Sequence, residues 1–81
     1  MKARIEVRLK PGILDPQGKA IQGALGGLGY SALGEVRQGK LIEIELPGSP
    51  DRKSAAAAVE SMCRTLLANP VTEDYRIELL D

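Results

Sequence analysis

One pair of glutamates in this chain has a spacing that suits acid–base chemistry. Glu43 and Glu45 are two residues apart. In a strand they would share one face, where one carboxylate can act as general acid and the other as general base. Arg4 and Arg8 lie four residues apart near the amino end, and on a neighbouring strand they would share one face and form cross-strand ion pairs with these carboxylates. We favour ion pairing over catalysis.

Cys63 is the one residue that offers a thiol nucleophile. The adjacent Arg64 would favour the thiolate form, which is the reactive form of cysteine. However, the chain has no histidine to serve as a base, and Cys63 lies at the margin of an apolar stripe on an expected helix. The pattern predicts a buried, unreactive cysteine.

Two short stretches have the glycine or the helix-start chemistry that binds phosphates elsewhere. Residues 26–29 (Gly-Gly-Leu-Gly) end an expected helix instead of opening one, which disfavours a dinucleotide site. Residues 15–18 open the same helix, but the carboxylate of Asp15 would itself occupy the positive helix end that an anion needs. We therefore expect Asp15 to be a helix cap, and we predict no catalytic, cofactor-binding or metal-binding residue in this chain.

The composition excludes several classes of partner. The 81 residues include 11 Lys plus Arg and 11 Asp plus Glu, so the net charge is zero, and there is no His, Phe or Trp. A nucleic-acid-binding protein normally presents a basic surface and aromatic rings for stacking. No apolar run reaches the length of a membrane span, and the single cysteine cannot form an internal disulfide. We expect one cytoplasmic domain, spanning residues 1–81, that binds neither nucleic acid nor membrane.

The turn after the first strand has a clear chemistry. Pro11 cannot donate to a strand ladder, Gly12 permits a positive φ, and Asp15 caps a helix that Pro16 opens. Residues 46–50 repeat this pattern in shorter form, with Ser49 as the cap and Pro50 as the first helical residue. The chain therefore turns twice from strand to helix in the same way.

Apolar periodicity predicts the order of the elements. Alternation predicts strands over residues 3–9, 32–37 and 40–46, and a last strand in which Tyr75, Ile77 and Leu79 face one side. Helical spacing predicts one helix over residues 16–28 and a second that starts at residue 50 or 51. The second carries Ala55, Ala58, Val59, Met62 and Leu66 on its apolar stripe. It is ended by Asn69 and Pro70.

The two middle strands are predicted to form a hairpin around Gly39. A two-residue loop would place Val36 opposite Leu41 and bury both glutamates of the second strand. A loop of odd length, with Gly39 in the left-handed conformation, places Val36 on the same face as Ile42. We expect the odd loop. The resulting β-α-β-β-α-β order predicts an α+β two-layer sandwich, a four-stranded antiparallel sheet with two helices on one face.

Two surfaces are candidates for protein contacts. Gly23, Gly26 and Gly27 lie opposite the apolar stripe of the first helix and would let another backbone approach closely. Leu33 and Leu41 are expected on the sheet face that the helices leave open. A domain of this size has little core to spare, so we expect a homodimer or higher oligomer.

Residues 9–20 (LKPGILDPQGKA), 36–40 (VRQGK) and 67–75 (LANPVTEDY) together resemble the PurS family of phosphoribosylformylglycinamidine (FGAM) synthase subunits. The resemblance implies a small, non-catalytic subunit with some likeness to ferredoxin-like folds. It also implies a dimer that bridges a glutaminase subunit and a large synthase subunit and so helps ammonia pass between them. The chain would need no cofactor, whereas the complex would use ATP, magnesium and glutamine.

A different class of function stays open as the alternative. A free-standing regulatory domain of ferredoxin-like shape would bind a small metabolite between protomers, and it would require no second protein. The sequence shows no cluster of polar residues converging on one loop that would form such a site. An RNA-binding sandwich is disfavoured by the zero net charge and by the missing strand aromatics.

Overall fold

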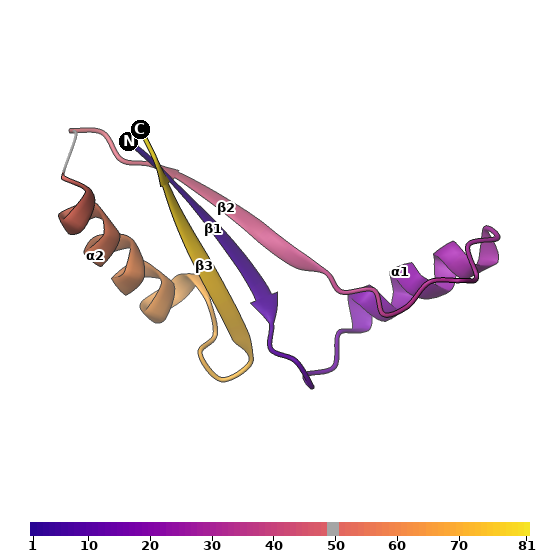
Figure 1. Cartoon of the computed structure of the whole chain (residues 1–81). Coiled ribbons are helices and arrows are strands. Elements are labelled where there is room, and N and C mark those ends of the chain that lie inside the picture. The colour runs from indigo at the N-terminus through magenta and orange to yellow at the C-terminus, as the bar shows by residue number, and fades with distance from the viewer. Residues whose placement is uncertain (49–50) are drawn as a thin grey trace.

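The central element is strand β1 (Lys2–Leu9), which pairs on both sides. The computed structural model describes residues 1–48 and 51–81. β1 lies antiparallel to β2 (Gly39–Glu45) and to β3 (Glu73–Leu80), which gives the order β2-β1-β3 (Figure 1). Ala3, Ile5 and Val7 point to one face and are almost fully buried, as the alternation predicts.

The prediction of a fourth strand is wrong for this chain. Residues 32–37 form no strand, and the described part of the chain holds a three-stranded sheet. Gly39 does not turn a hairpin, because it is the first residue of β2 and lies opposite Arg8. The glycines with positive φ are Gly12, Gly29 and Gly48. The chain runs straight into β2, so residues 32–37 cannot fold back on it.

One helix covers the inner face of the sheet. Helix α2 (Arg52–Met62) continues into a wider π-helical turn, η1 (Cys63–Leu67), which is closed by the hydrogen bond from Ala68 N to Cys63 O at 3.0 Å. Val59 and Cys63 are fully buried against β1. The extra residue in the turn rotates the chain that follows, so Leu67 packs against the core and Leu66, expected inside, is 83% exposed. The predicted cap Ser49 and first helical residue Pro50 lie outside the described residues.

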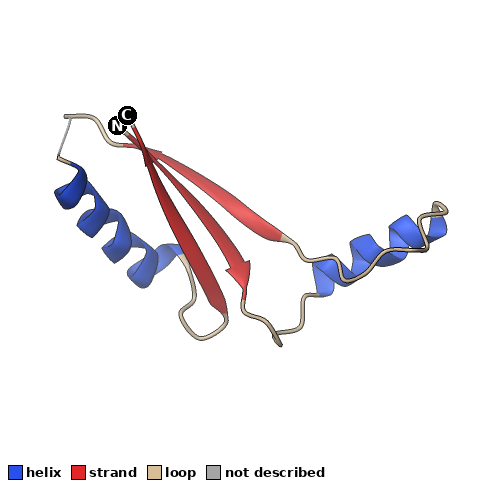
Figure 2. Cartoon of the chain, viewed as in Figure 1, coloured by secondary structure: helices blue, strands red, loops and turns tan. Residues whose placement is uncertain are grey.

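The other helix, α1 (Pro16–Gly27), leaves the sheet. It projects away from the three strands, and the chain that follows it runs back alongside it to β2 (Figures 1 and 2). The expectation of two helices on one face is therefore wrong within one chain. The radius of gyration is 16.2 Å, whereas a compact domain of this length has roughly 12 Å. We call residues 16–38, the helix with its returning segment, the arm.

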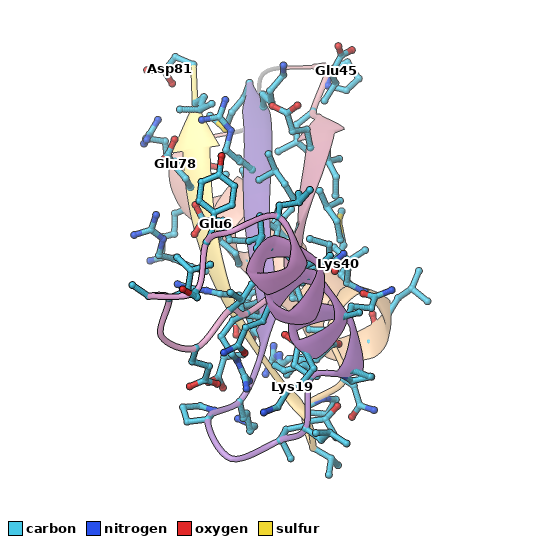
Figure 3. The ribbon with its side chains drawn as sticks, turned by 90° about the vertical axis from the view of Figure 1, so that its right-hand side faces the viewer. Glu6, Lys19, Lys40, Glu45, Glu78 and Asp81 are labelled. Carbon is cyan, nitrogen blue, oxygen red and sulfur yellow. The ribbon has the colours of Figure 1, made fainter. Side chains whose placement is uncertain are left out.

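The outer face of the sheet is covered by ion pairs instead of a helix. Arg4 lies 3.5 Å from both Glu43 and Glu78, which confirms the predicted cross-strand pairing of Arg4 with Glu43. On this face Leu41 lies opposite Glu6, while Lys40 lies opposite Val7 on the inner face (Figure 3). Neither α1 nor α2, within residues 1–48 and 51–81, is long and apolar enough to cross a membrane.

Candidate functional site

The base of the arm is organised by Asp15. Its Oδ1 accepts a hydrogen bond from Gly18 N at 2.8 Å, which confirms the predicted helix cap. Its Oδ2 accepts a second hydrogen bond from Gln38 N at 2.7 Å. The bond from Gln38 N, followed by the one from Gly18 N and the charge of Arg37, holds the pKa of the Asp15 carboxyl below its usual value. Both carboxylate oxygens are used inside the chain, which supports the cap over an anion site.

Arg37 also binds the residues at the base of the arm. Its guanidinium donates to the carbonyl oxygens of Leu9, Lys10 and Ile13 at 3.3, 3.1 and 3.2 Å and pairs with Glu35 at 3.0 Å. A planar fork with several donors can bind carbonyls in different directions at once, which a lysine cannot do. Arg37 therefore fixes the loop before α1 to the segment that returns from α1.

Gly18 is the third member of this junction. A Cβ built on it would lie 2.3 Å from Val36 O and 2.7 Å from Asp15 Oδ2, so any side chain would push the returning segment away from α1. Sequence reasoning singled out neither Gly18 nor Arg37 for this role. The available signal was a glycine in the first turn of a helix, where it lowers helix stability unless close contact requires it.

The turn residues predicted from the sequence keep the chain in place around this junction. Gly12 has a φ of 87° in the loop after Pro11, and Pro16 opens α1. At the same end of the sheet, before β3, the amide oxygen of Asn69 accepts a hydrogen bond from Val71 N at 3.0 Å, which turns the chain at Pro70. Gly12 and Pro16 thus lie as the turn chemistry predicts, whereas Gly39 does not adopt the predicted left-handed conformation. Asn69 and Pro70 follow the end of η1, where Ala68 is already extended.

The arm presents apolar side chains to solvent. Ile21 on α1 and Leu28 directly after it are 40% and 74% exposed, and Leu33 on the returning segment is 43% exposed. A compact domain would bury such an amphipathic stripe. The stripe that sequence analysis placed against this chain's own sheet is therefore free for another surface.

The predicted contact residues fall in three places. Gly23, Gly26 and Gly27 lie on α1, and apart from their neighbours in the helix no described atom lies within 4 Å of a Cβ built on them. Leu33 lies on the arm, and Leu41 lies on the outer face of β2. The structure thus does not bring Leu33 and Leu41 together on one sheet face, because residues 32–37 are not part of the sheet. Leu33 and the three glycines instead all lie on the arm.

A shallow hollow of about 420 Å³ lies beside the junction. Its charged lining comes from Arg8, Glu35, Arg37 and Asp74. Arg37 pairs with Glu35, and Asp74 pairs with Lys10 at 2.6 Å. These two pairs occupy Glu35, Arg37 and Asp74 and leave Arg8 as the remaining charged lining residue, so the hollow offers few free groups that would orient a small metabolite.

Cys63 is buried, as the sequence predicts. Cys63 is fully buried, and burial, followed by the nearby Glu60 carboxylate, raises the pKa of its thiol. A protonated and inaccessible thiol is a poor nucleophile. Among the described residues, no three His, Cys, Asp or Glu side chains are grouped to hold a metal ion.

Comparison with known proteins finds close relatives over nearly the whole chain. Residues 2–81 match the family model PurS, described as phosphoribosylformylglycinamidine (FGAM) synthase. The chain is 46% identical over 76 residues to the FGAM synthase subunit PurS of a Synechocystis species, covering 94% of this chain and 75% of the relative. It is 44% identical over 78 residues to PurS of Methanocaldococcus jannaschii, covering 96% and 93%.

Solved structures show the same fold. The structure of Bacillus subtilis PurS is 42% identical, with a TM-score of 0.86 over 99% of this chain and 98% of the other. A chain in the structure of PurLQS from Thermotoga maritima is 27% identical, with a TM-score of 0.77 over 98% and 95%. The three-stranded sheet and the two helices described here thus match structures of PurS.

Proposed function

Because this chain belongs to the PurS family, we propose that it is the small subunit of FGAM synthase in purine biosynthesis. The observation that carries this proposal is the match over residues 2–81, which includes the arm and its junction as well as the sheet. The chain covers at least 75% of each of the two relatives compared above, so the resemblance extends over most of their length and is not limited to a shared motif.

The subunit has no catalytic role of its own. The complex converts formylglycinamide ribonucleotide to the amidine with ATP, magnesium and glutamine, and the nitrogen comes from ammonia released by the glutaminase subunit. This chain has no histidine, and its one cysteine is buried with a raised pKa. It acts by holding the glutaminase and the large synthase subunit together so that ammonia passes between their sites without escaping to solvent.

The arm supplies the contact surface, and the subunit works as a homodimer. Support comes from the open glycine face of α1 and from the exposed apolar residues on the same arm. The glycine face of α1 lacks side chains, which suits close approach by the backbone of a partner subunit. The exposed apolar residues suit burial against a second copy.

The test is reconstitution from the three purified subunits. Amidation should depend on this chain when glutamine is the nitrogen donor, and should depend on it much less when ammonium salt is supplied. A pair of synthase and glutaminase that uses glutamine at the full rate without this chain would contradict the bridging role. If the chain is purified from its native cell without either partner and binds a metabolite, that result would support the regulatory alternative.

A further inference from the structure

Two cations near the base of the arm are left out of its ion pairs. Arg8 lies opposite Asp74 in the β1–β3 ladder, but Asp74 pairs with Lys10 at 2.6 Å instead. Lys19, in the first turns of α1, is the other. Within the part of the chain that the structure describes, neither Arg8 nor Lys19 forms an ion pair with a carboxylate.

The hollow beside the junction continues into a second hollow. The second has a volume of about 390 Å³, and Gly12, Glu35 and Arg37 line both. We call the two hollows together the arm groove. Arg8 lines only the first hollow and Lys19 only the second, so the two unpaired cations lie toward opposite ends of the arm groove.

The stem of Arg8 lies beside a residue that has no side chain. Gly39 is opposite Arg8 in the β1–β2 ladder, and a Cβ built on Gly39 would lie 2.9 Å from Cγ of Arg8. Glycine therefore leaves room for the arginine stem next to the first hollow. An arginine whose stem is already packed loses less freedom when its guanidinium binds a carboxylate through two parallel hydrogen bonds.

The other charged groups of the arm groove are satisfied within the chain. Arg37 pairs with Glu35 at 3.0 Å, and both carboxylate oxygens of Asp15 accept backbone hydrogen bonds. The bonds from Arg37 to the loop before α1 also hold the walls in place. The arm groove thus offers one free positive charge toward each end, on walls that are fixed before a partner arrives.

The Lys19 end of the arm groove leads to the glycine face of α1. Gly23 follows Lys19 by four residues, and Gly26 follows by seven, so the three positions share one side of the helix. Figure 3 shows Lys19 next to the loop that precedes α1. A subunit that approaches the glycine face therefore also reaches Lys19 and the arm groove beyond it.

We propose that the arm groove binds an acidic segment of the partner subunit that contacts the glycine face, with one carboxylate on Arg8 and a second on Lys19. This deepens the bridging role proposed above and rests on it. Between the two cations, Leu14 lines the second hollow and is 72% exposed. An apolar side chain between the two acidic residues of the segment covers it.

Carboxylates suit this groove better than phosphates do. Each end offers one positive charge, whereas a phosphate monoester carries a charge of about −1.5 to −2 near neutral pH. The surplus negative charge would lie beside Glu35 and Asp74, which line the first hollow. Side-chain carboxylates carry a single charge, and a protein segment presents two of them at a fixed spacing.

Carbodiimide crosslinking of the assembled three-subunit complex tests the contact. The reagent joins a lysine amine to a carboxylate when the two groups touch, and Arg8→Lys makes the second site reactive while it keeps the charge. Peptide mass spectrometry should find Lys19, and the substituted position 8, joined to one acidic stretch of the same partner subunit. Lys53, an exposed lysine on α2, is the matched control and should not be joined to that stretch.

Charge reversal supplies a second measurement. Arg8→Glu and Lys19→Glu should each weaken association with that subunit by about tenfold or more, and added salt should weaken association of the unmodified chain. Arg8→Gln removes the charge without placing a carboxylate beside Asp74 and should also weaken association. Melting curves confirm that the variants are folded, and Lys53→Glu makes the same change of charge on α2 and should bind normally.

The outcomes separate the groove from the bridging role. A complex that forms normally with Arg8→Gln and Lys19→Glu and uses glutamine at the full rate would overturn the groove and leave the bridging role intact. Crosslinks from Lys19 to a second copy of this chain, with none to a partner subunit, would also overturn it. If no complex forms even with the unmodified chain, the bridging role fails, and the groove proposal fails with it.

Discussion

Asp15 Oδ2 accepts a hydrogen bond from Gln38 N at 2.7 Å, and this contact joins two positions that are 23 residues apart. The same carboxylate caps α1 through Gly18 N. One side chain therefore connects the start of the arm to its end, next to the point where β2 begins. The predictions below follow from this junction and from the surfaces that it positions.

Asp15→Asn should lower the thermal midpoint by about 4–8 °C at neutral pH, because an amide has one acceptor oxygen and can no longer accept from both backbone donors. The pKa of the Asp15 carboxyl is lowered from 3.8 in the folded chain. Its stabilising effect is therefore complete above that value and is lost as the pH falls through the lowered pKa. Melting curves of both proteins from pH 7 to pH 2.5 should converge at the acid end. A constant difference would contradict this account.

Arg37→Lys should loosen the arm, although it keeps the charge. A lysine cannot reach the carbonyl oxygens of Leu9, Lys10 and Ile13 together. Hydrogen exchange over residues 9–15 and 35–39 should become faster, while the exchange of β3 stays unchanged. Arg64→Lys is the matched control, since the exposed Arg64 of η1 makes a 4.0 Å ion pair with Glu60. Equal effects of both substitutions would show that Arg37 does not stabilise the junction.

Gly39→Asn should destabilise the chain about as much as Gly39→Ala. A Cβ at this position would lie 2.6 Å from Val7 O, so crowding decides, at a cost of roughly 1–3 kcal/mol. A left-handed turn would instead accept Asn well. Gly12→Asn is the control, because Gly12 has a φ of 87° and open space around it. Urea titration of the three variants distinguishes the two explanations.

Gly23→Leu and Gly27→Leu should leave the isolated chain at least as stable as the unmodified protein, because leucine favours the helix and nothing lies within 4 Å of either position. If the glycine face contacts a partner, both variants should lose assembly with the synthase and glutaminase subunits. Analytical size exclusion of the mixed subunits measures this. Normal assembly would show that the face is only a thin surface, and an unfolded variant would place it inside the homodimer.

The thiol of Cys63 should react with a disulfide reagent only as fast as the chain unfolds, since the side chain is fully buried and the pKa is raised. Labelling kinetics in native buffer and in urea check this prediction.

The isolated chain should also turn over neither glutamine nor ATP. Glutamine turnover that disappears in Cys63→Ala would contradict the non-catalytic role.

The sequence by itself determined the local elements and their chemistry. Alternation in residues 3–9 predicts β1, and the Asp15–Pro16 pair predicts the start of α1. Periods of 2.0 and 3.6 residues also predict the other strands and α2, although they add a strand over residues 32–37 that the chain does not form. These signals depend on neighbours a few positions apart, so no tertiary contact is needed to read them. The family resemblance was also readable from the sequence.

Only the tertiary structure decided where the arm goes. The alternation in residues 32–37 predicts a strand, but a period of two does not say whether this segment folds back on β2 or runs beside α1. The junction determines the path of the segment. There Asp15 accepts a hydrogen bond from Gln38 N, and Arg37 donates to three carbonyl oxygens of the loop before α1. Those contacts join positions more than 20 residues apart, and a periodic pattern carries no information about them.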